Sequence, residues 1–185
     1  GAYSGADDAA IVYHEYTHGL SNRLVTDGSG QGALDSPQAG AMGEAWSDFY
    51  AMDHIVGTGL RTDGPGPGDL KVGDYVDNGG DLIRTEALDC RPGSPAIACP
   101  GSGAAGSGGY TYGDFGRIIN APEVHADGEI WAQTLWQLRQ ALVDAYGATE
   151  GMTRAEAYVT DAMRLSPPEP SFLDMRNAIL QASTT

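Results

Sequence analysis

The sequence has few basic residues and no long apolar run. Its 185 residues include 10 Lys and Arg against 25 Asp and Glu, a formal net charge of −15 at pH 7. Such an acidic surface repels phosphate backbones and anionic lipid, so we expect neither nucleic acid nor a membrane as a partner. No apolar run approaches the roughly 18 residues that a membrane-spanning helix needs. These absences exclude several classes of protein without naming a function.

Cysteine is also scarce. Cys90 and Cys99 are the only two, in a stretch rich in Gly, Pro and Ser, and their spacing matches neither a CxxC motif nor a zinc ribbon. We expect a disulfide that closes a surface loop in an oxidising compartment, with two free thiols in a cytosolic protein as the alternative. The first residues lack the basic and apolar regions of a signal peptide, so we expect that any targeting segment was removed or never present.

The hydrophobic pattern predicts a mainly α fold with long loops and little sheet. Apolar residues make up 41% of the chain, and its length suits a single domain spanning 1–185. We expect helices over about 7–25 and 41–56, a short strand over 70–76, and an irregular segment rich in Gly over 86–122. The C-terminal third predicts helices over 124–146, 153–165 and 171–182.

The first expected helix contains a motif with metal-binding spacing. Residues 14–18 are His-Glu-Tyr-Thr-His, a match to the H-E-x-x-H pattern. His14 and His18 lie one helical turn apart on one face, so both imidazoles can reach one metal ion. Glu15 can reach a water bound to that ion, whose pKa zinc lowers to about 7. Such short patterns also occur by chance, and each histidine could instead make an ordinary hydrogen bond.

The second expected helix supplies two acids one turn apart, Glu44 and Asp48. A catalytic zinc site needs a third protein ligand, for which Glu44 is the candidate. Asp48 could accept the outer N–H of a ligating histidine. The alternative is a solvated acidic face, but the surrounding helix is apolar, where unpaired carboxylates are costly to bury.

Three blocks of the sequence together resemble the fungalysin family of extracellular zinc metallopeptidases, which is related to thermolysin. The blocks are residues 12–24, 42–49 and 122–136. The resemblance covers nearly the whole chain and implies the helical lobe of a thermolysin-like zinc peptidase. It implies zinc on His14, His18 and Glu44, Glu15 as general base and proton shuttle, and Asp48 as the acid that orients a ligating histidine.

The third block resembles the segment in which thermolysin-like enzymes place a histidine that donates to the tetrahedral oxyanion. His125 is therefore the candidate transition-state stabiliser; the alternative is a structural histidine at a helix N-terminus. Thermolysin has an aspartate five positions before that histidine, where this chain has Asn120. Glu123 and Glu129 are candidate replacements for it, and both could equally be charges near a helix start.

Residues 82–85 resemble the segment that carries the substrate-binding arginine of this group. The guanidinium of Arg84 could grip a peptide carbonyl through two N–H groups, or it could form a salt bridge with a local acid. Tyr110 and Tyr112 are candidates for a second oxyanion donor.

A calcium site is a second, weaker expectation. Calcium favours carboxylate and carbonyl oxygens, but no EF-hand spacing is present, so we favour a solvated acidic loop. The acids concerned are Asp63, Asp69, Asp74, Asp77 and Asp81.

The resemblance implies a secreted zinc endopeptidase that cleaves protein or peptide substrates by attack of a zinc-bound water activated by Glu15. Thermolysin-like catalytic domains have a sheet-rich lobe before the zinc helix, whereas 13 residues precede His14 here. We therefore expect an N-terminal lobe or propeptide outside this chain. The alternative function is a zinc-binding lobe that is inactive alone and needs a separate N-terminal lobe.

Overall fold

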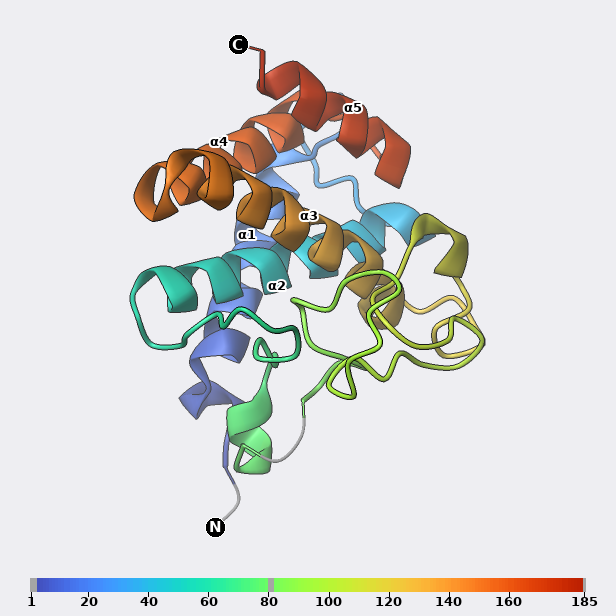
Figure 1. The fold of residues 1–185 in the computed structure, drawn as a ribbon. Coiled ribbons are helices and arrows are strands. Elements are labelled where there is room, and N and C mark those ends of the chain that lie inside the picture. Colours follow the sequence, from blue (N-terminus) through green and yellow to red (C-terminus); the bar gives the residue numbers. More distant parts are fainter. Residues whose placement is uncertain (1–2, 80–81, 185) are drawn as a thin grey trace.

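Five α-helices form the framework of the computed structural model, which describes residues 3–79 and 82–184 apart from the side chain of Asp77. The helices are α1 (Ala9–Leu24), α2 (Pro37–Gly57), α3 (Val124–Tyr146), α4 (Ala148–Leu165) and α5 (Phe172–Ala182). Helix α2 packs between α1 and α3, and α4 and α5 stack beyond α3 (Figure 1). Within the described residues only isolated β-bridges occur. The mainly α fold is confirmed.

Local capping groups determine where α1 and α2 begin. The Asp8 carboxylate accepts hydrogen bonds from the backbone N–H groups of Ala10 and Ile11, so α1 starts at residue 9 rather than 7. Helix α2 starts at Pro37, four residues earlier than expected, because proline suits the first position of a helix. Most of α2 is buried, and Trp46 is fully inaccessible to solvent.

Close helix packing is possible at two glycines. A Cβ at Gly128 of α3 would lie 2.8 Å from a backbone oxygen of α2, so these helices approach at their backbones. A Cβ at Gly151 of α4 would lie 2.4 Å from the Val143 Cα of α3. Helix α3 has the expected bounds, whereas α4 begins five residues early, directly after Gly147, which adopts a left-handed φ of 83°.

The expected strand over 70–76 is wrong. Gly73 has a left-handed φ of 71°, which ends any extended run, and a short 3-10 helix, η2 (Asp74–Asp77), follows it. The preceding residues still pair with a neighbouring segment, because the Ile83 N–H donates to the Val72 carbonyl at 3.0 Å and the Leu88 N–H donates to the Leu70 carbonyl at 2.9 Å.

The segment 86–122 is irregular, as expected, with one short 3-10 helix, η3 (Tyr112–Asp114). It lies against the N-terminal half of α3, where Tyr110 N–H donates to Gln133 and Gly116 N–H donates to Asp127. The disulfide between Cys90 and Cys99 is confirmed, with the two Cα atoms 5.6 Å apart and both residues buried.

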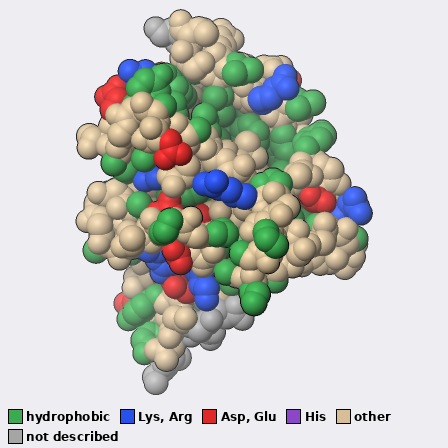
Figure 2. Space-filling view, in the orientation of Figure 1, with side chains coloured by type: hydrophobic (Ala, Val, Ile, Leu, Met, Phe, Trp, Pro, Cys, Tyr) green, Lys and Arg blue, Asp and Glu red, His purple; other side chains and the backbone are tan. Residues whose placement is uncertain are grey.

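Charged side chains are dispersed over the face drawn in Figure 2, with basic groups interspersed among acidic and apolar ones. The 10 Lys and Arg of the sequence are likewise scattered along the chain, without a basic run. Within the described part of the chain, no helix has the length and apolar character required to cross a membrane.

Candidate metal centre

Two helices bring three ligand-type side chains to one point. His14 and His18 project from α1, and their Nε2 atoms lie 3.1 Å apart. Glu44 projects from α2, with Oε2 3.2 Å from His14 Nε2 and Oε1 3.6 Å from His18 Nε2. Glu44 follows the two histidines by 26 or more positions in the sequence. The three predicted ligands nevertheless lie together as one group.

The spacing of this group fits a tetrahedral ion. Atoms placed tetrahedrally about 2.0–2.1 Å from zinc lie about 3.3–3.4 Å from one another, close to the three observed separations. The Oε2 atom of Glu44 is buried and makes no hydrogen bond, although nitrogen atoms surround it. A buried carboxylate oxygen without a donor is costly, and a cation at this point would satisfy it.

Asp48 contacts one ring nitrogen of His14. Its Oδ1 lies 2.7 Å from His14 Nδ1, which leaves Nε2 directed toward Glu44. Burial lowers the pKa of His14, but the nearby carboxylates of Asp48 and Glu44 outweigh this effect and raise it to about 9. Burial opposes ionisation of Asp48 too, yet Arg84 and His14 hold the pKa of Asp48 below its ordinary value. The site thus favours positive charge, which a metal ion would supply in place of a proton.

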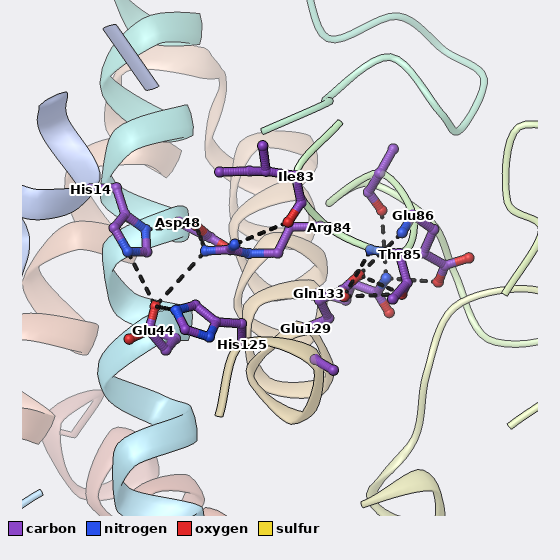
Figure 3. A network of polar contacts seen from close by, with 12 residues as sticks. His14, Glu44, Asp48, Ile83, Arg84, Thr85, Glu86, His125, Glu129 and Gln133 are labelled. Atoms are coloured by element: carbon purple, nitrogen blue, oxygen red, sulfur yellow. Dashed lines mark hydrogen bonds and ion pairs between the residues drawn. The ribbon is translucent and has the colours of Figure 1, made fainter. Parts of the chain in front are cut away.

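Arg84 is paired with both carboxylate oxygens of Asp48, including the one that contacts His14. Its Nε donates to Asp48 Oδ2 at 2.7 Å and its Nη2 donates to Oδ1 at 3.0 Å (Figure 3). The side chain is 6% exposed. The ion pair that the sequence left as an alternative therefore exists, and it connects Arg84 through Asp48 to His14.

His125 lies at the start of α3 and faces the same point. Its Nε2 is 3.3 Å from Glu44 Oε2, and its Nδ1 is 2.6 Å from Glu123 Oε1. Glu123 also caps α3 by accepting the backbone N–H groups of His125 and Ala126. Of the two candidate replacements for the missing aspartate, Glu123 contacts His125. Glu129 bonds instead to Thr85 and Glu86.

A small cavity adjoins these groups. It has a volume of about 90 Å³ and is lined by Ile11, His14, Glu15, Val72, Ile83, Arg84 and His125. Glu15, the predicted base, and His125, the predicted oxyanion donor, thus share the cavity with a predicted ligand. Tyr110 and Tyr112 are not among its lining residues. Tyr110 is buried with its hydroxyl 2.6 Å from Thr85 Oγ1, and Tyr112 accepts a hydrogen bond from Gln38.

The acids considered for calcium are dispersed. Asp63 accepts from Trp136 and Asp74 pairs with Arg61, while Asp69 accepts a backbone N–H. Asp81 and the Asp77 side chain lie outside the described residues. Among the described residues, the other group of metal-ligand side chains is Glu86 with Cys90 and Cys99. The two cysteines form the disulfide. A calcium site stays a prediction.

Two features of the site escaped the sequence reasoning. The bond from Arg84 to Asp48 joins residues 36 positions apart, and the bonds from Glu129 to Thr85 and Glu86 span more than 40. No local sequence pattern indicates either of these contacts. Only the abundance of acids near Arg84 allowed for an ion pair.

The fold is mainly helical, and its H-E-x-x-H helix converges with a glutamate of the next helix. These two features define a candidate metallopeptidase. The chain belongs to the fungalysin metallopeptidase family (M36), whose model matches residues 2–185. The resemblance found in the sequence is thereby confirmed.

Three relatives show the extent of the similarity. The chain is 35% identical to the extracellular metalloproteinase mep of Aspergillus fumigatus (strain CBS 144.89 / FGSC A1163 / CEA10), over 97% of this chain and 27% of that protein. It is 34% identical to the extracellular metalloproteinase MEP of Fusarium vanettenii, over 95% and 26%. It is 35% identical to extracellular metalloproteinase 2 of Arthroderma otae, over 95% and 27%. The chain therefore spans 26–27% of the length of these relatives.

Proposed function

We propose that this chain is the zinc-binding helical lobe of a secreted metalloendopeptidase. The observation that carries the proposal is the convergence of His14, His18 and Glu44, with a buried Glu44 oxygen that has no hydrogen-bond donor. Their nitrogen and carboxylate atoms are ligands that zinc prefers. When bound, zinc would lower the pKa of a coordinated water and polarise a peptide carbonyl.

Glu15 is proposed as the base of the reaction. Glu15 lines the cavity beside His14 and follows that residue directly on α1. From this position it can take a proton from the attacking water and pass it to the leaving amine, as general acid–base catalysis requires.

His125 and Arg84 are proposed to act on the substrate. With Nδ1 held by Glu123, a protonated His125 presents its Nε2–H to the developing oxyanion. Arg84 lines the same cavity, and its side chain is fixed by two bonds to Asp48. Its Nη1, which also donates to the Ile83 carbonyl at 3.2 Å, is proposed to donate its other N–H to a peptide carbonyl.

The rest of the active site is proposed to lie outside these residues. The relatives are named extracellular proteins and are roughly four times as long as this chain. We propose an N-terminal lobe or propeptide as a partner, with proteins or peptides as substrates. A disulfide supports residence in an oxidising, extracellular compartment. The alternative is a lobe that binds zinc but is inactive by itself.

Zinc content and hydrolysis of a quenched fluorescent peptide, measured on the purified chain with and without chelator, test the proposal. We expect one zinc per chain, chelator-sensitive hydrolysis, and loss of hydrolysis with retained zinc in Glu15→Gln. Glu150→Gln makes the same change at an exposed site on α4 and should leave both unchanged. Zinc without hydrolysis would support the inactive-lobe alternative, and a chain without zinc would overturn both.

A further inference from the structure

A buried carboxylate on α3 holds the segment next to Arg84. Glu129 is 4% exposed and lies one turn after His125. Its Oε1 accepts the Thr85 backbone N–H at 3.0 Å and the Thr85 hydroxyl at 2.9 Å, and its Oε2 accepts the Glu86 N–H at 3.2 Å. All of its described hydrogen bonds therefore go to two consecutive residues of one irregular segment.

Other contacts also hold this segment, because Gln133 Nε2 lies 3.4 Å from the Ala87 carbonyl and the Gly101 N–H donates to Glu86 Oε2 at 3.0 Å. Glu129, however, supplies the acceptors for the backbone N–H groups of Thr85 and Glu86. Residues 82–87 belong to no helix or strand, so no ladder of hydrogen bonds sets their conformation. The Tyr110 hydroxyl reaches the Thr85 hydroxyl at 2.6 Å, and Ile83 N–H donates to Val72. The bonds to Glu129 thus determine where the Thr85 backbone lies relative to α3.

The side chains on either side of that backbone point in opposite directions. In Figure 3, Thr85 faces Glu129 whereas Arg84 extends toward Asp48 and His14. Because Arg84 makes two directed bonds to Asp48, a shift of its backbone would lengthen at least one of them. Asp48 in turn holds the Nδ1 atom of His14.

We propose that Glu129 is a positioning residue of the metal centre, acting through Thr85, Arg84 and Asp48 on the orientation of His14. The inference rests on the proposed function, in which His14 is a zinc ligand. Burial raises the pKa of Glu129 to about 8, so the fold keeps an ionisable group at a place where its charge is disfavoured. Its place on α3 also agrees with this role, because residues 125, 129 and 133 share one face at helical spacing.

Gln133 supplies a matched control one turn further along that face. Its Nε2 donates to Glu86 Oε1 at 2.8 Å, and its Oε1 accepts the Tyr110 N–H at 2.7 Å. Gln133 is as buried as Glu129 and anchors the same loop region through Tyr110, Glu86 and Ala87, but its described hydrogen bonds do not reach Thr85 or Arg84. A purely structural role predicts similar consequences for both residues.

The test measures the zinc dissociation constant of the full chain by competition with a chromophoric chelator, alongside Tm. We expect Glu129→Gln to weaken zinc binding by about 10-fold, the range found for residues that support metal ligands. The reason is that the amide NH2 of glutamine would face the N–H of Glu86. Gln133→Leu should lower Tm by a similar amount and leave the dissociation constant within about 2-fold of wild type.

A second set of variants isolates the route through Arg84. Thr85→Val removes the hydroxyl bond and should weaken zinc binding. Thr85→Ser keeps the hydroxyl and should bind zinc as tightly as the wild type. In an Arg84→Ala background, Glu129→Gln should have almost no further effect, because the link to Asp48 is already broken. If Glu129→Gln does not fold, Thr85→Val and Thr85→Ser carry the test.

Wild-type zinc affinity in both Glu129→Gln and Thr85→Val would overturn the inference while leaving the proposed function intact. A Glu129→Gln effect that persists in full without Arg84 would also overturn it. Absence of zinc binding by the wild-type chain would instead overturn the proposed function, and the inference with it.

Discussion

Replacing Asp48 by asparagine would remove a buried charge while preserving the shape of the side chain. The carboxylate of Asp48 is 2% exposed and contacts His14 Nδ1 at 2.7 Å and Arg84 at 2.7 and 3.0 Å. Asparagine has one carbonyl oxygen and one NH2 group, so at least one N–H of Arg84 or His14 would then face another donor.

The structure indicates the size of the loss. Arg84 is 6% exposed, so its charge would stay buried after its partner is neutralised. Removing one partner of a buried ion pair costs about 3–5 kcal/mol. Glu44 lies 3.8 Å from Arg84 Nη2 and compensates in part. We therefore expect the free energy of unfolding to fall by about 3 kcal/mol, the lower end of that range.

Urea unfolding followed by tryptophan fluorescence measures this loss, with chelator present so that metal binding does not contribute. Asp161→Asn is the matched control, because Asp161 also pairs with an arginine, Arg164, but both side chains are about half exposed. We expect the control to lose less than about 1 kcal/mol. Asp48→Asn combined with Arg84→Met should recover part of the loss, since no buried charge is then unpaired.

Equal losses in Asp48→Asn and Asp161→Asn would refute the reasoning, because burial would then add nothing to the cost. If the double variant loses more unfolding free energy than the two single variants lose together, the argument that the unpaired Arg84 charge dominates is refuted.

Three further predictions concern the fold. Replacing Cys90 and Cys99 together by serine should lower the free energy of unfolding by about 2.5–3 kcal/mol in urea, and reducing agent should destabilise only the wild type. Gly128→Ala should cost about 1–3 kcal/mol, because its Cβ would lie 2.8 Å from a backbone oxygen of α2, whereas Gly28→Ala, which meets nothing within 4 Å, should be nearly neutral in the same assay. Burial raises the pKa of Glu129 from 4.5 to about 8, so the folded chain binds more protons than the unfolded chain between these values, and this group makes stability fall as pH rises through that window. Glu129→Gln should remove that slope from the unfolding free energy measured between those pH values; an unchanged slope would contradict it.

Local signals account for the parts of the fold that were predicted well. Helix α3 has the bounds expected from its helical periodicity, whereas α2 begins at Pro37, four residues before its expected start, because proline suits the first position of a helix. The expected strand over 70–76 failed at Gly73, whose left-handed backbone no composition rule specified. Short apolar runs do not distinguish a strand from an extended loop, because both alternate side chains in the same way.

The candidate site also has parts that the sequence predicted and parts that it did not. The sequence alone identified the H-E-x-x-H helix and the acids of the next helix, because helical spacing is a local property that fixes which side chains share a face. Only the tertiary structure decided that Arg84 pairs with Asp48, that Glu123 contacts His125, and that Glu129 holds Thr85. These contacts depend on how α3 and an irregular segment pack against α2. A chain with so many acids offers each cation several partners, and only distance in space selects among them.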